Sequence, residues 1–264
     1  SRGLGDVYKR QKENIMLTAI LNEIDQLKIE LNQLRPLDSQ SVCHALDIEY
    51  TYESNRIEGN TLTLSETALV IDKGMTVSGK SLREHLEAIN HYQAVLLLKE
   101  FVHDEIPLTE QLIKQFHALI LQSIDPKNAG VYRLQPVMIS GSSHIPPAHF
   151  KVPEEMETCL AWFNQQVQNQ TLHPVLLAAE MHERVVSIHP FIDGNGRTSR
   201  LIMNLLLMQH GYPIANISGS VESRRFYYDA LELCHSGDKN QFLLLVAQQV
   251  KDSMKRLIKI AKGE

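Results

Sequence analysis

Apolar residues recur every three to four positions along most of the chain, and this spacing predicts a mainly helical protein. The longest such pattern covers residues 8–35 and has apolar positions at Leu17, Ile20, Ile24, Leu27, Leu31 and Leu34. It fits either a coiled-coil seam in a homodimer or a helix packed on its own domain. Ile15, Leu21 and Ile29 widen the apolar stripe, which favours the second reading. Arg35-Pro36 is expected to end this helix.

Shorter amphipathic patterns predict further helices along the rest of the chain. They cover residues 39–58, 81–101, 109–123, 154–169, 173–188 and 251–262, and others open near residues 63, 197 and 225. Thr63 and Glu66 have the spacing of a capping box, and Thr109 is a suitable N-cap. The chain is therefore expected to form a single, mainly helical unit, of which residues 1–36 are the N-terminal helix.

A convincing β pattern occurs at residues 131–145. Val137, Met138 and Ile139 precede a Ser-Gly-Ser-Ser turn, and His144-Ile145 follow it before two prolines. Short β-rich runs on either side of a turn predict a hairpin, although a plain connecting loop is the alternative. Because prolines cannot continue a ladder, the hairpin should be small and open at one edge. The expected fold class is all-α with a small β-hairpin.

Composition narrows the class of partner. The chain has 264 residues, is 43% hydrophobic and carries a net charge of −5, with no evident basic face. These features argue against a nucleic-acid partner. Three scattered cysteines fit a reducing compartment, and no apolar run reaches membrane-spanning length. A cytoplasmic protein without a membrane partner is the expectation.

The stretch from residue 189 to residue 200 concentrates groups suited to phosphate chemistry. His189 precedes a proline and should lie at the exit of a helix. Its imidazole, with a reference pKa near 6.5, can act as a general base, and activity should rise between about pH 6 and 7. Asp193 offers a hard oxygen ligand, which suits Mg²⁺ shared with phosphate oxygens. Phe191 is expected to point inward and anchor the loop.

The second half of the same stretch predicts an anion site. Gly194, Asn195 and Gly196 form a turn that opens the next helix, whose N–H groups and dipole attract an anion. Arg197 and Arg200 are three residues apart on the first turn and can both reach that anion. Together with His189, these groups predict a site for phosphoryl chemistry.

The stretch His-Pro-Phe-Ile-Asp-Gly-Asn-Gly-Arg-Thr-Ser-Arg resembles the signature of the Fic family, His-Pro-Phe-x-Asp-Gly-Asn-Gly-Arg-x-x-Arg, at every fixed position. The resemblance implies the helical Fic fold and transfer of AMP from ATP to a Ser, Thr or Tyr hydroxyl of a protein target, including the chain itself. It assigns His189 as catalytic base and Asp193 as Mg²⁺ ligand. Doc-type relatives carry Lys in place of Gly196 and move phosphate, so Gly196 favours AMP transfer. A non-catalytic binding module would have lost His189 or Asp193.

Ser54 and Glu58 form a second similarity. They lie four residues apart on one helix face, before Gly59 as a natural helix stop. Ser-x-x-x-Glu-Gly resembles the Fic inhibitory motif, which implies that Glu58 pairs with Arg200 in the place of a nucleotide γ-phosphate. Residues 37–78 would then hold the inhibitory helix and residues 79–264 the Fic core. Some self-inhibited members remove AMP from proteins, so the reverse reaction is an alternative.

Two further segments resemble family elements. Residues 227–232, followed by Gly-Asp at 237–238, resemble the segment that lines the adenine pocket, and Tyr228 is the candidate for contact with the base. His235 stands where the family often has Asn, which leaves the nucleotide preference open. Residues 130–133 with the predicted hairpin resemble the Fic flap. Val137, Met138 and Ile139 would there align the target through main-chain pairing.

Overall fold

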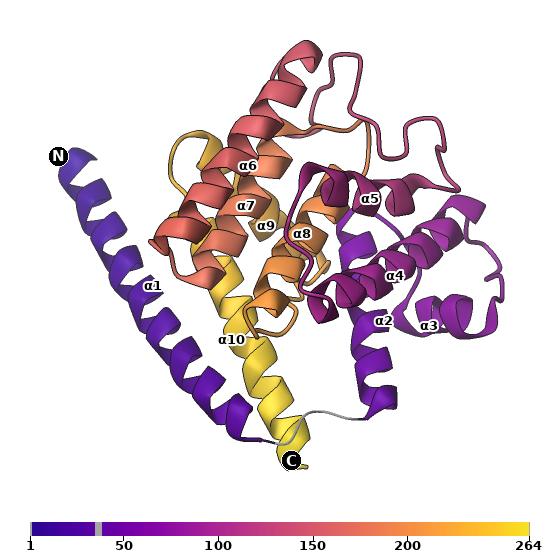
Figure 1. The fold of residues 1–264 in the computed structure, drawn as a ribbon, viewed down its shortest axis with the longest axis horizontal. Helices are drawn as coiled ribbons and strands as arrows, with labels where there is room; N and C mark the ends of the chain where they lie inside the picture. The colour runs from indigo at the N-terminus through magenta and orange to yellow at the C-terminus, as the bar shows by residue number, and fades with distance from the viewer. Residues whose placement is uncertain (1, 35–38, 264) are drawn as a thin grey trace.

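The computed structural model describes residues 2–34 and 39–263, and helices dominate both ranges (Figure 1). The elements are α1 (Arg2–Gln33), α2 (Gln40–Ile57), α3 (Leu64–Lys73), α4 (Leu82–His103), α5 (Glu110–Leu121), η1 (His149–Lys151), α6 (Val152–Asn169), α7 (Pro174–Ile188), α8 (Asn195–Gln209), α9 (Val221–His235) and α10 (Asn240–Lys262). The fold class is all-α, as the sequence predicts. Within these two ranges, no helix has the combination of length and apolar character that crossing a bilayer requires.

Helix α8 lies at the centre of the molecule. Residues 197–207 are all buried, and the helix packs against α2, α4, α5 and α7. A helix that is buried on all sides is stable only when other helices surround it. This packing places the N-terminus of α8 inside the protein, directly after the end of α7. The loop between these two helices is therefore the part of the chain on which the surrounding helices converge.

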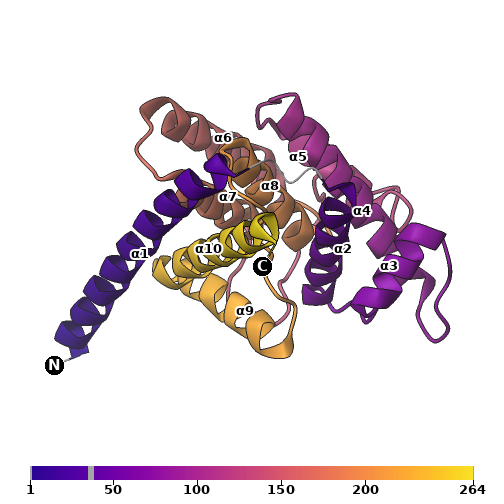
Figure 2. The same cartoon turned by 90° about the horizontal axis from the view of Figure 1, so that it is seen from below.

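Helix α1 packs along α10 rather than standing alone. Leu17, Ile20 and Ile24 are buried in the main core, whereas Ile15 is 65% and Ile29 54% exposed. Lys255 of α10 pairs with Glu23 at 2.5 Å, and the N-terminal end of α1 projects past the other helices (Figure 2). The prediction that this helix packs on its own domain is confirmed, and the homodimer stays a prediction. The predicted stop at Arg35-Pro36 lies outside the described residues.

Most predicted helix starts are confirmed by their caps. The Thr63 hydroxyl accepts the Glu66 N–H, the Glu66 carboxylate accepts the Thr63 N–H, and the Thr109 hydroxyl accepts the Leu112 N–H. Helix α9 starts at Val221, earlier than expected, because the Ser220 hydroxyl accepts the Ser223 N–H. The basic segment 251–262 is the second half of α10, since no Pro or Gly interrupts the chain between residues 240 and 262.

The predicted β-hairpin is wrong: none of the described residues forms a β-strand. Residues 131–148, here called the flap loop, are irregular and contain a turn in which the Ser142 N–H donates to the Ile139 carbonyl at 3.2 Å. Pro136, Pro146 and Pro147 supply no N–H groups for a ladder. The Ser143 N–H, which a hairpin would need, instead donates to the Glu232 side chain. The stretch 137–139 thus has no partner strand among residues 2–34 and 39–263.

Candidate active site

A cavity of about 520 Å³ opens where α2, the flap loop, the α7–α8 loop and α9 meet. It is lined by Glu58, residues 138–142, Val186, His189, residues 192–196, Arg224, residues 227–229, Leu231, Glu232 and His235. The segments that the sequence singled out separately, from residue 58 to residue 235, therefore line one space. Such a concave site with a few convergent polar groups is the usual form of a small-molecule site.

His189 ends helix α7 with a left-handed backbone conformation, φ +51° and ψ +58°. Its predicted place at the helix exit is confirmed. Nδ1 lies 3.3 Å from the Val186 carbonyl, which can only accept, so Nδ1 carries the proton and the Nε2 lone pair is free. Burial lowers the pKa of His189, and the nearby charge of Arg133 acts in the same direction. The imidazole is thus neutral at pH 7, as a general base must be.

The loop after His189 is held rigidly from within. The Asn195 side chain accepts the Phe191 N–H and donates to the Phe191 carbonyl, both at 2.9 Å. Phe191 is fully buried and stacks on the His117 ring, with centroids 3.6 Å apart, and His117 Nε2 lies 2.9 Å from the Asp193 carbonyl. The prediction that Phe191 anchors the loop is confirmed. The Asn195 side chain fixes the loop, and only its backbone N–H is left for an anion.

The N-terminus of α8 faces the cavity with the geometry that an anion site requires, and anion binding there stays a prediction. Gly194 has a φ of +78°, which turns the chain into the helix, and the first N–H groups of α8 have no acceptor within the helix. Gly196 leaves room for the Glu58 carboxylate, because a Cβ at this position would clash with it. A carboxylate of the chain itself therefore lies over the helix N-terminus, at the position predicted for a phosphate.

Arg200 binds this carboxylate. Its Nη2 lies 2.7 Å from Glu58 Oε1 and 2.8 Å from the Ser54 carbonyl, and its Nε donates to the Ser54 hydroxyl at 3.0 Å. Burial disfavours the charge of Arg200, but Glu58 and the Tyr227 hydroxyl raise its pKa. The predicted pair of Glu58 and Arg200 is confirmed. Arg200 is 1% exposed and is absent from the cavity lining, because Glu58 lies between it and the cavity.

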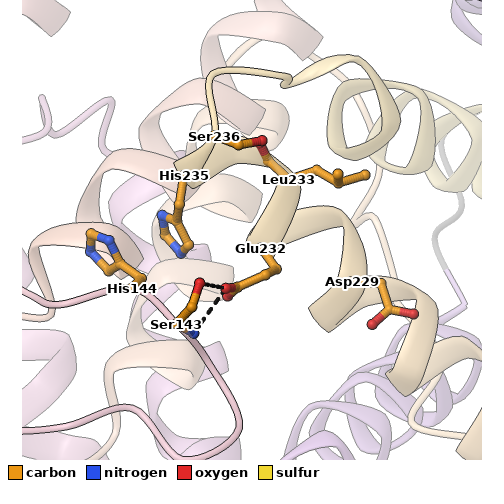
Figure 3. Close-up of a pocket in the computed structure, with 7 residues that line it drawn as sticks. All are labelled: Ser143, His144, Asp229, Glu232, Leu233, His235 and Ser236. Atoms are coloured by element: carbon orange, nitrogen blue, oxygen red, sulfur yellow. Dashed lines mark hydrogen bonds between the residues drawn. The ribbon is translucent and has the colours of Figure 1, made fainter. Parts of the chain in front are cut away.

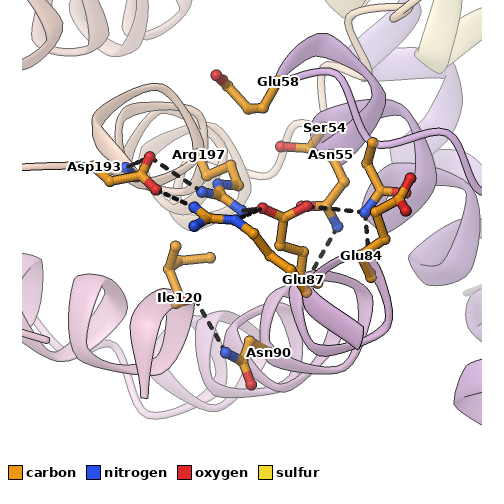
Figure 4. A network of polar contacts seen from close by, with 12 residues as sticks. Ser54, Asn55, Glu58, Glu84, Glu87, Asn90, Ile120, Asp193 and Arg197 are labelled. Carbon is orange, nitrogen blue, oxygen red and sulfur yellow. Dashed lines mark hydrogen bonds and ion pairs between the residues drawn. The ribbon is translucent and has the colours of Figure 1, made fainter. Parts of the chain in front are cut away.

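Arg197 does not share the anion with Arg200 as expected. Its guanidinium is 2% exposed and lies between two carboxylates, with Nη1 3.4 Å from Glu87 Oε1 and Nη2 3.4 Å from Asp193 Oδ1 (Figure 4). Two residues three apart on a buried helix take different partners here, because α4 presents Glu87 and α2 presents Glu58. Arg197 consequently supports Asp193 in this structure instead of facing the cavity.

Asp193 meets the requirements of a single carboxylate ligand for a hard cation. Its side chain is 44% exposed, lines the cavity and contacts Arg83 Nη2 at 2.5 Å. Burial raises its pKa, but Arg197, the Gly194 N–H at 2.6 Å and Arg83 together lower that pKa below its usual value. The carboxylate is therefore ionised. No cluster of three or more His, Cys, Asp or Glu side chains suited to a metal exists within the described ranges. Mg²⁺ bound here would take its other ligands from phosphates and water.

The flap loop is fastened to α9 beside the cavity (Figure 3). The Glu232 carboxylate accepts the Ser143 N–H at 2.8 Å and the Ser142 hydroxyl at 2.5 Å. The rings of His144 and His235 stack with centroids 3.8 Å apart and planes at 8°. Burial lowers the pKa of His235, and the neighbouring His144 has the same effect. His235 thus belongs to the cavity wall, and the nucleotide preference stays open.

Tyr228 lines the cavity together with two of the three predicted docking residues, Met138 and Ile139. Tyr228 is 41% exposed, lines the cavity and donates to the Ile57 carbonyl at 3.1 Å, whereas Tyr227 is buried. Met138 is 94% exposed, Ile139 also lines the cavity, and Val137 is half-buried. Base contact by Tyr228 and target docking by residues 137–139 stay predictions.

Sequence reasoning missed several residues of this region. Arg83 and Glu87 lie four residues apart on α4, a spacing that predicts only an ion pair within one helix. In the structure Arg83 also contacts Asp193, and Glu87 also contacts Arg197. His117 of α5 contacts the Asp193 carbonyl and Arg133 of the flap loop contacts the His189 carbonyl, and the sequence pattern predicts neither contact. Each reaches the signature loop across 56 or more residues of sequence, so no local pattern reports the contact.

The fold and the site define a helical protein in which a neutral histidine faces a cavity at a helix N-terminus, and comparison with known proteins gives its family. The profile of the Fic/DOC family matches residues 107–207. A Fic domain-containing signaling protein from Bacteroides thetaiotaomicron is 30% identical, with a TM-score of 0.83 over 93% of this chain and 97% of that chain. Fic-1 (aa134–508) from C. elegans is 29% identical, with a TM-score of 0.86 over 97% of this chain and 76% of that one. The chain belongs to the Fic/DOC family.

Curated relatives of this chain are named protein adenylyltransferases. Protein adenylyltransferase Fic of Drosophila melanogaster is 39% identical over 199 residues, which are 75% of this chain and 39% of the relative. Protein adenylyltransferase fic-1 of Caenorhabditis elegans is 34% identical over 246 residues, which are 90% of this chain and 47% of the relative. The chain thus spans less than half the length of these curated relatives.

Proposed function

We propose that this protein transfers AMP from ATP to a hydroxyl group of a target protein and that Glu58 inhibits this reaction. One observation carries the proposal: the Glu58 carboxylate contacts Arg200 above Gly196, at the N-terminus of α8, in the cavity that also holds His189. A carboxylate in an anion site beside a neutral base indicates that a phosphate belongs there when the carboxylate leaves. The names of the curated relatives support the same activity.

His189 supplies the proton chemistry of this reaction. Its free Nε2 accepts the proton of a Ser, Thr or Tyr hydroxyl as that oxygen attacks the α-phosphorus of ATP. A bond forms between the hydroxyl oxygen and the α-phosphorus, and the bond from that phosphorus to the pyrophosphate oxygen breaks. Pyrophosphate leaves, and the AMP group remains on the target. The N–H groups at the start of α8 stabilise the charge that develops on the α-phosphate.

Mg²⁺ is the metal we propose, held by Asp193. The ionised and partly exposed carboxylate fits one ligand position of a hard cation, provided that Arg83 moves aside. When bound, Mg²⁺ would neutralise phosphate charge and favour departure of pyrophosphate. Arg83 is 55% exposed, so its movement requires no rearrangement of the core.

Self-inhibition follows from competition for one site. The γ-phosphate of ATP and the Glu58 carboxylate would both bind Arg200, and α2 holds the carboxylate there through the Ser54 contacts. A tethered group acts at about millimolar effective concentration even when its linker is flexible. We infer that ATP binds in a non-productive way while Glu58 is in place, and that release of Glu58 permits transfer.

The target class is a protein with an accessible hydroxyl, and the chain itself is included. Residues 137–139 of the flap loop have no partner strand in the part of the chain that the structure describes, so an extended target segment could pair with their backbone. Leu134, Met138 and Ile145 are each more than 80% exposed beside this stretch. Exposed apolar groups beside unpaired backbone favour an extended segment with apolar side chains.

ATP labelled at either the α- or the γ-phosphate tests the reaction class. The Glu58→Gly variant is incubated with each label, alone and with a cell lysate, and proteins are separated by gel electrophoresis. AMP transfer predicts labelled protein from α-labelled ATP and none from γ-labelled ATP. Label from γ-labelled ATP would instead identify phosphate transfer. His189→Ala in the same background is the control for catalysis at this site.

The reverse reaction is a second candidate, favoured by the position of Glu58. Its side chain is 29% exposed and lines the same cavity as His189, where it could orient a water toward an AMP-modified hydroxyl. Protein labelled by the Glu58→Gly variant is a suitable substrate for the test. Release of AMP by the wild-type chain, but not by Glu58→Gly, would support this activity, and no release by either would contradict it.

A further inference from the structure

Arg133 is a buried arginine without a counter-charge. It is 3% exposed, and no carboxylate among the described residues lies within ion-pair distance of it. All hydrogen bonds of its guanidinium go to backbone carbonyls. A buried charge without a partner is costly, and burial accordingly lowers the pKa of Arg133, although arginine keeps its proton in proteins. A charged group buried in this way beside a cavity is a candidate for a functional role.

One set of Arg133 contacts surrounds the backbone of His189. Its Nε donates to the His189 carbonyl at 2.8 Å, its Nη2 lies 3.5 Å from the Ile188 carbonyl, and its backbone N–H donates to the Pro190 carbonyl at 3.0 Å. His189 has a φ of +51°, which is unfavourable for a residue with a Cβ. Arg133 therefore fixes the peptide groups on both sides of the strained residue.

A second set of contacts joins the two ends of the flap loop. Nη1 donates to the Gln135 carbonyl at 3.3 Å, and Nη2 donates to the Pro147 carbonyl at 2.5 Å. These carbonyls precede and follow the stretch 137–139 and the turn at 139–142. A single planar guanidinium thus holds both flap ends at a fixed distance from the histidine backbone. The rigid fork of donors makes arginine suited to such a junction, and lysine is not equivalent.

The charge of Arg133 also faces the imidazole. Of the charged or titratable groups near His189, Arg133 and His144 of the flap loop disfavour imidazolium, and Glu58 of α2 favours it. Burial acts in the same direction as Arg133 and is the larger cause. Removal of the arginine charge should therefore raise the pKa of His189, whereas a lysine at the same position should leave it near the wild-type value.

We propose that Arg133 is a positioning residue that joins the flap loop to His189, so that the target-docking surface and the general base keep a fixed relative position. This role rests on the proposed function, because it presumes that His189 is the base and that the flap loop receives the target. Arg133 itself touches neither ATP nor the reacting hydroxyl. Its hydrogen bonds set the geometry, and its charge helps to keep the imidazole unprotonated.

Two matched variants of the full chain separate the effect of the Arg133 hydrogen bonds from the effect of its charge. Arg133→Gln removes the charge and the fork, Arg133→Lys keeps the charge and removes the fork, and Arg184→Gln removes one charge from α7 as a control. The pKa of His189 is measured by NMR titration of the imidazole, assigned with His189→Ala, and flap mobility by hydrogen exchange of residues 134–147. Neither readout requires enzymatic activity. In the Glu58→Gly background, self-labelling by α-labelled ATP provides the rate.

We expect the titration midpoint of His189 to move to higher pH in Arg133→Gln only, and flap exchange to accelerate in both Arg133 variants. Self-labelling should fall about tenfold or more in both, since each loses charge-assisted hydrogen bonds.

An unchanged midpoint in Arg133→Gln, or unchanged flap exchange in both variants, overturns the proposal. If Arg133→Gln fails to fold, hydrogen exchange of the flap loop in Arg133→Lys tests the proposal: faster exchange supports it and unchanged exchange overturns it. If the Glu58→Gly variant with an intact Arg133 shows no labelling, the proposed function is refuted. The titration of His189 and the hydrogen exchange of the flap loop then still test the role of Arg133.

Discussion

At the scale of single residues, His189 combines a strained backbone with an exposed lone pair. The backbone strain is borne by surrounding hydrogen bonds, and Nδ1 is held by the Val186 carbonyl. This arrangement fixes both the ring orientation and the tautomer before substrate binds. Preorganisation of this kind is how a weak base becomes effective in a site.

His189→Ala should abolish AMP transfer in the Glu58→Gly background and leave ATP binding nearly intact. General base catalysis contributes about 10²–10⁴-fold, whereas phosphate binding depends on α8 and Arg200. Labelling with α-labelled ATP measures the loss, and calorimetry with ATP measures binding. Retention of near-normal transfer by this variant would remove His189 from the role of base.

The pH dependence of transfer reports on the same imidazole. The structure lowers the pKa of His189 below the ordinary value of 6.5, so the base is fully available at pH 7 and is lost only as pH falls through that lowered pKa. The acid limb of the rate should therefore lie below pH 6.5, lower than the sequence alone suggests. A rate profile from pH 5 to 8 checks this, and a limb centred above pH 7 would contradict it.

Asp193→Ala should abolish transfer and weaken ATP binding in the presence of Mg²⁺. The carboxylate is the ionised group at the cavity to which we assign the metal, and excess Mg²⁺ cannot restore a lost ligand geometry. Calorimetry with and without EDTA provides the measurement. If the parent protein binds ATP equally tightly in EDTA, Asp193 has no metal role.

At the scale of elements, α1 and α10 form a continuous packed pair through apolar and ionic contacts. Ile24 is fully buried within this pair, while Ile15 on the same helix is 65% exposed. Lys251 and Lys255 both reach Glu23, but such partly exposed ion pairs contribute little. Apolar burial therefore supplies most of the stability of this contact.

Ile24→Ala should destabilise the chain by about 2–5 kcal/mol, because it removes a buried side chain from a well-packed core. Ile15→Ala is the matched control and should change stability by less than about 0.5 kcal/mol. Urea denaturation of both variants measures the free energies of unfolding. Equal values for the two variants would contradict the packing of α1 on its own domain.

The sequence predicts the helices well because their periodicity and caps are local. It also predicts the meeting of Glu58 with Arg200, through a motif rather than through spacing. It fails for the hairpin, since Glu232 takes a backbone N–H that a ladder would use. It fails for Arg197, because the carboxylate that holds it comes from α4. Contacts between elements that are distant in sequence determine both the flap conformation and the partner of Arg197. The hydrophobic pattern of the sequence does not predict such contacts.

At the scale of the whole molecule, the structure shows the site with Glu58 in place. Helix α2 carries Ser54 and Glu58 against the first turn of α8, and the Arg200 guanidinium is enclosed by both. Breaking a buried ion pair by removing one partner costs about 3–5 kcal/mol, and the partial exposure of Glu58 places this pair near the lower end. The γ-phosphate of ATP can replace the lost carboxylate on Arg200.

The thermal stability of Glu58→Gly should reflect this exchange of partners. The variant should melt at a lower temperature than the wild type when alone, because Arg200 loses its counter-charge. Addition of ATP and Mg²⁺ should restore more stability to the variant than to the wild type, since ligand binding stabilises the folded state. Differential scanning fluorimetry with and without ATP checks this. An equal ATP-induced shift in both proteins would argue against competition between Glu58 and the γ-phosphate.

The most direct test compares labelling of protein by α-labelled ATP in the wild type, Glu58→Gly and Glu49→Gly. Glu49 lies on the same helix but pairs with Arg256 at the surface, so its replacement loosens α2 without opening the cavity. The account predicts strong labelling by Glu58→Gly, of itself or of lysate proteins, and little by the other two. Equal labelling by the wild type and Glu58→Gly would contradict self-inhibition by Glu58.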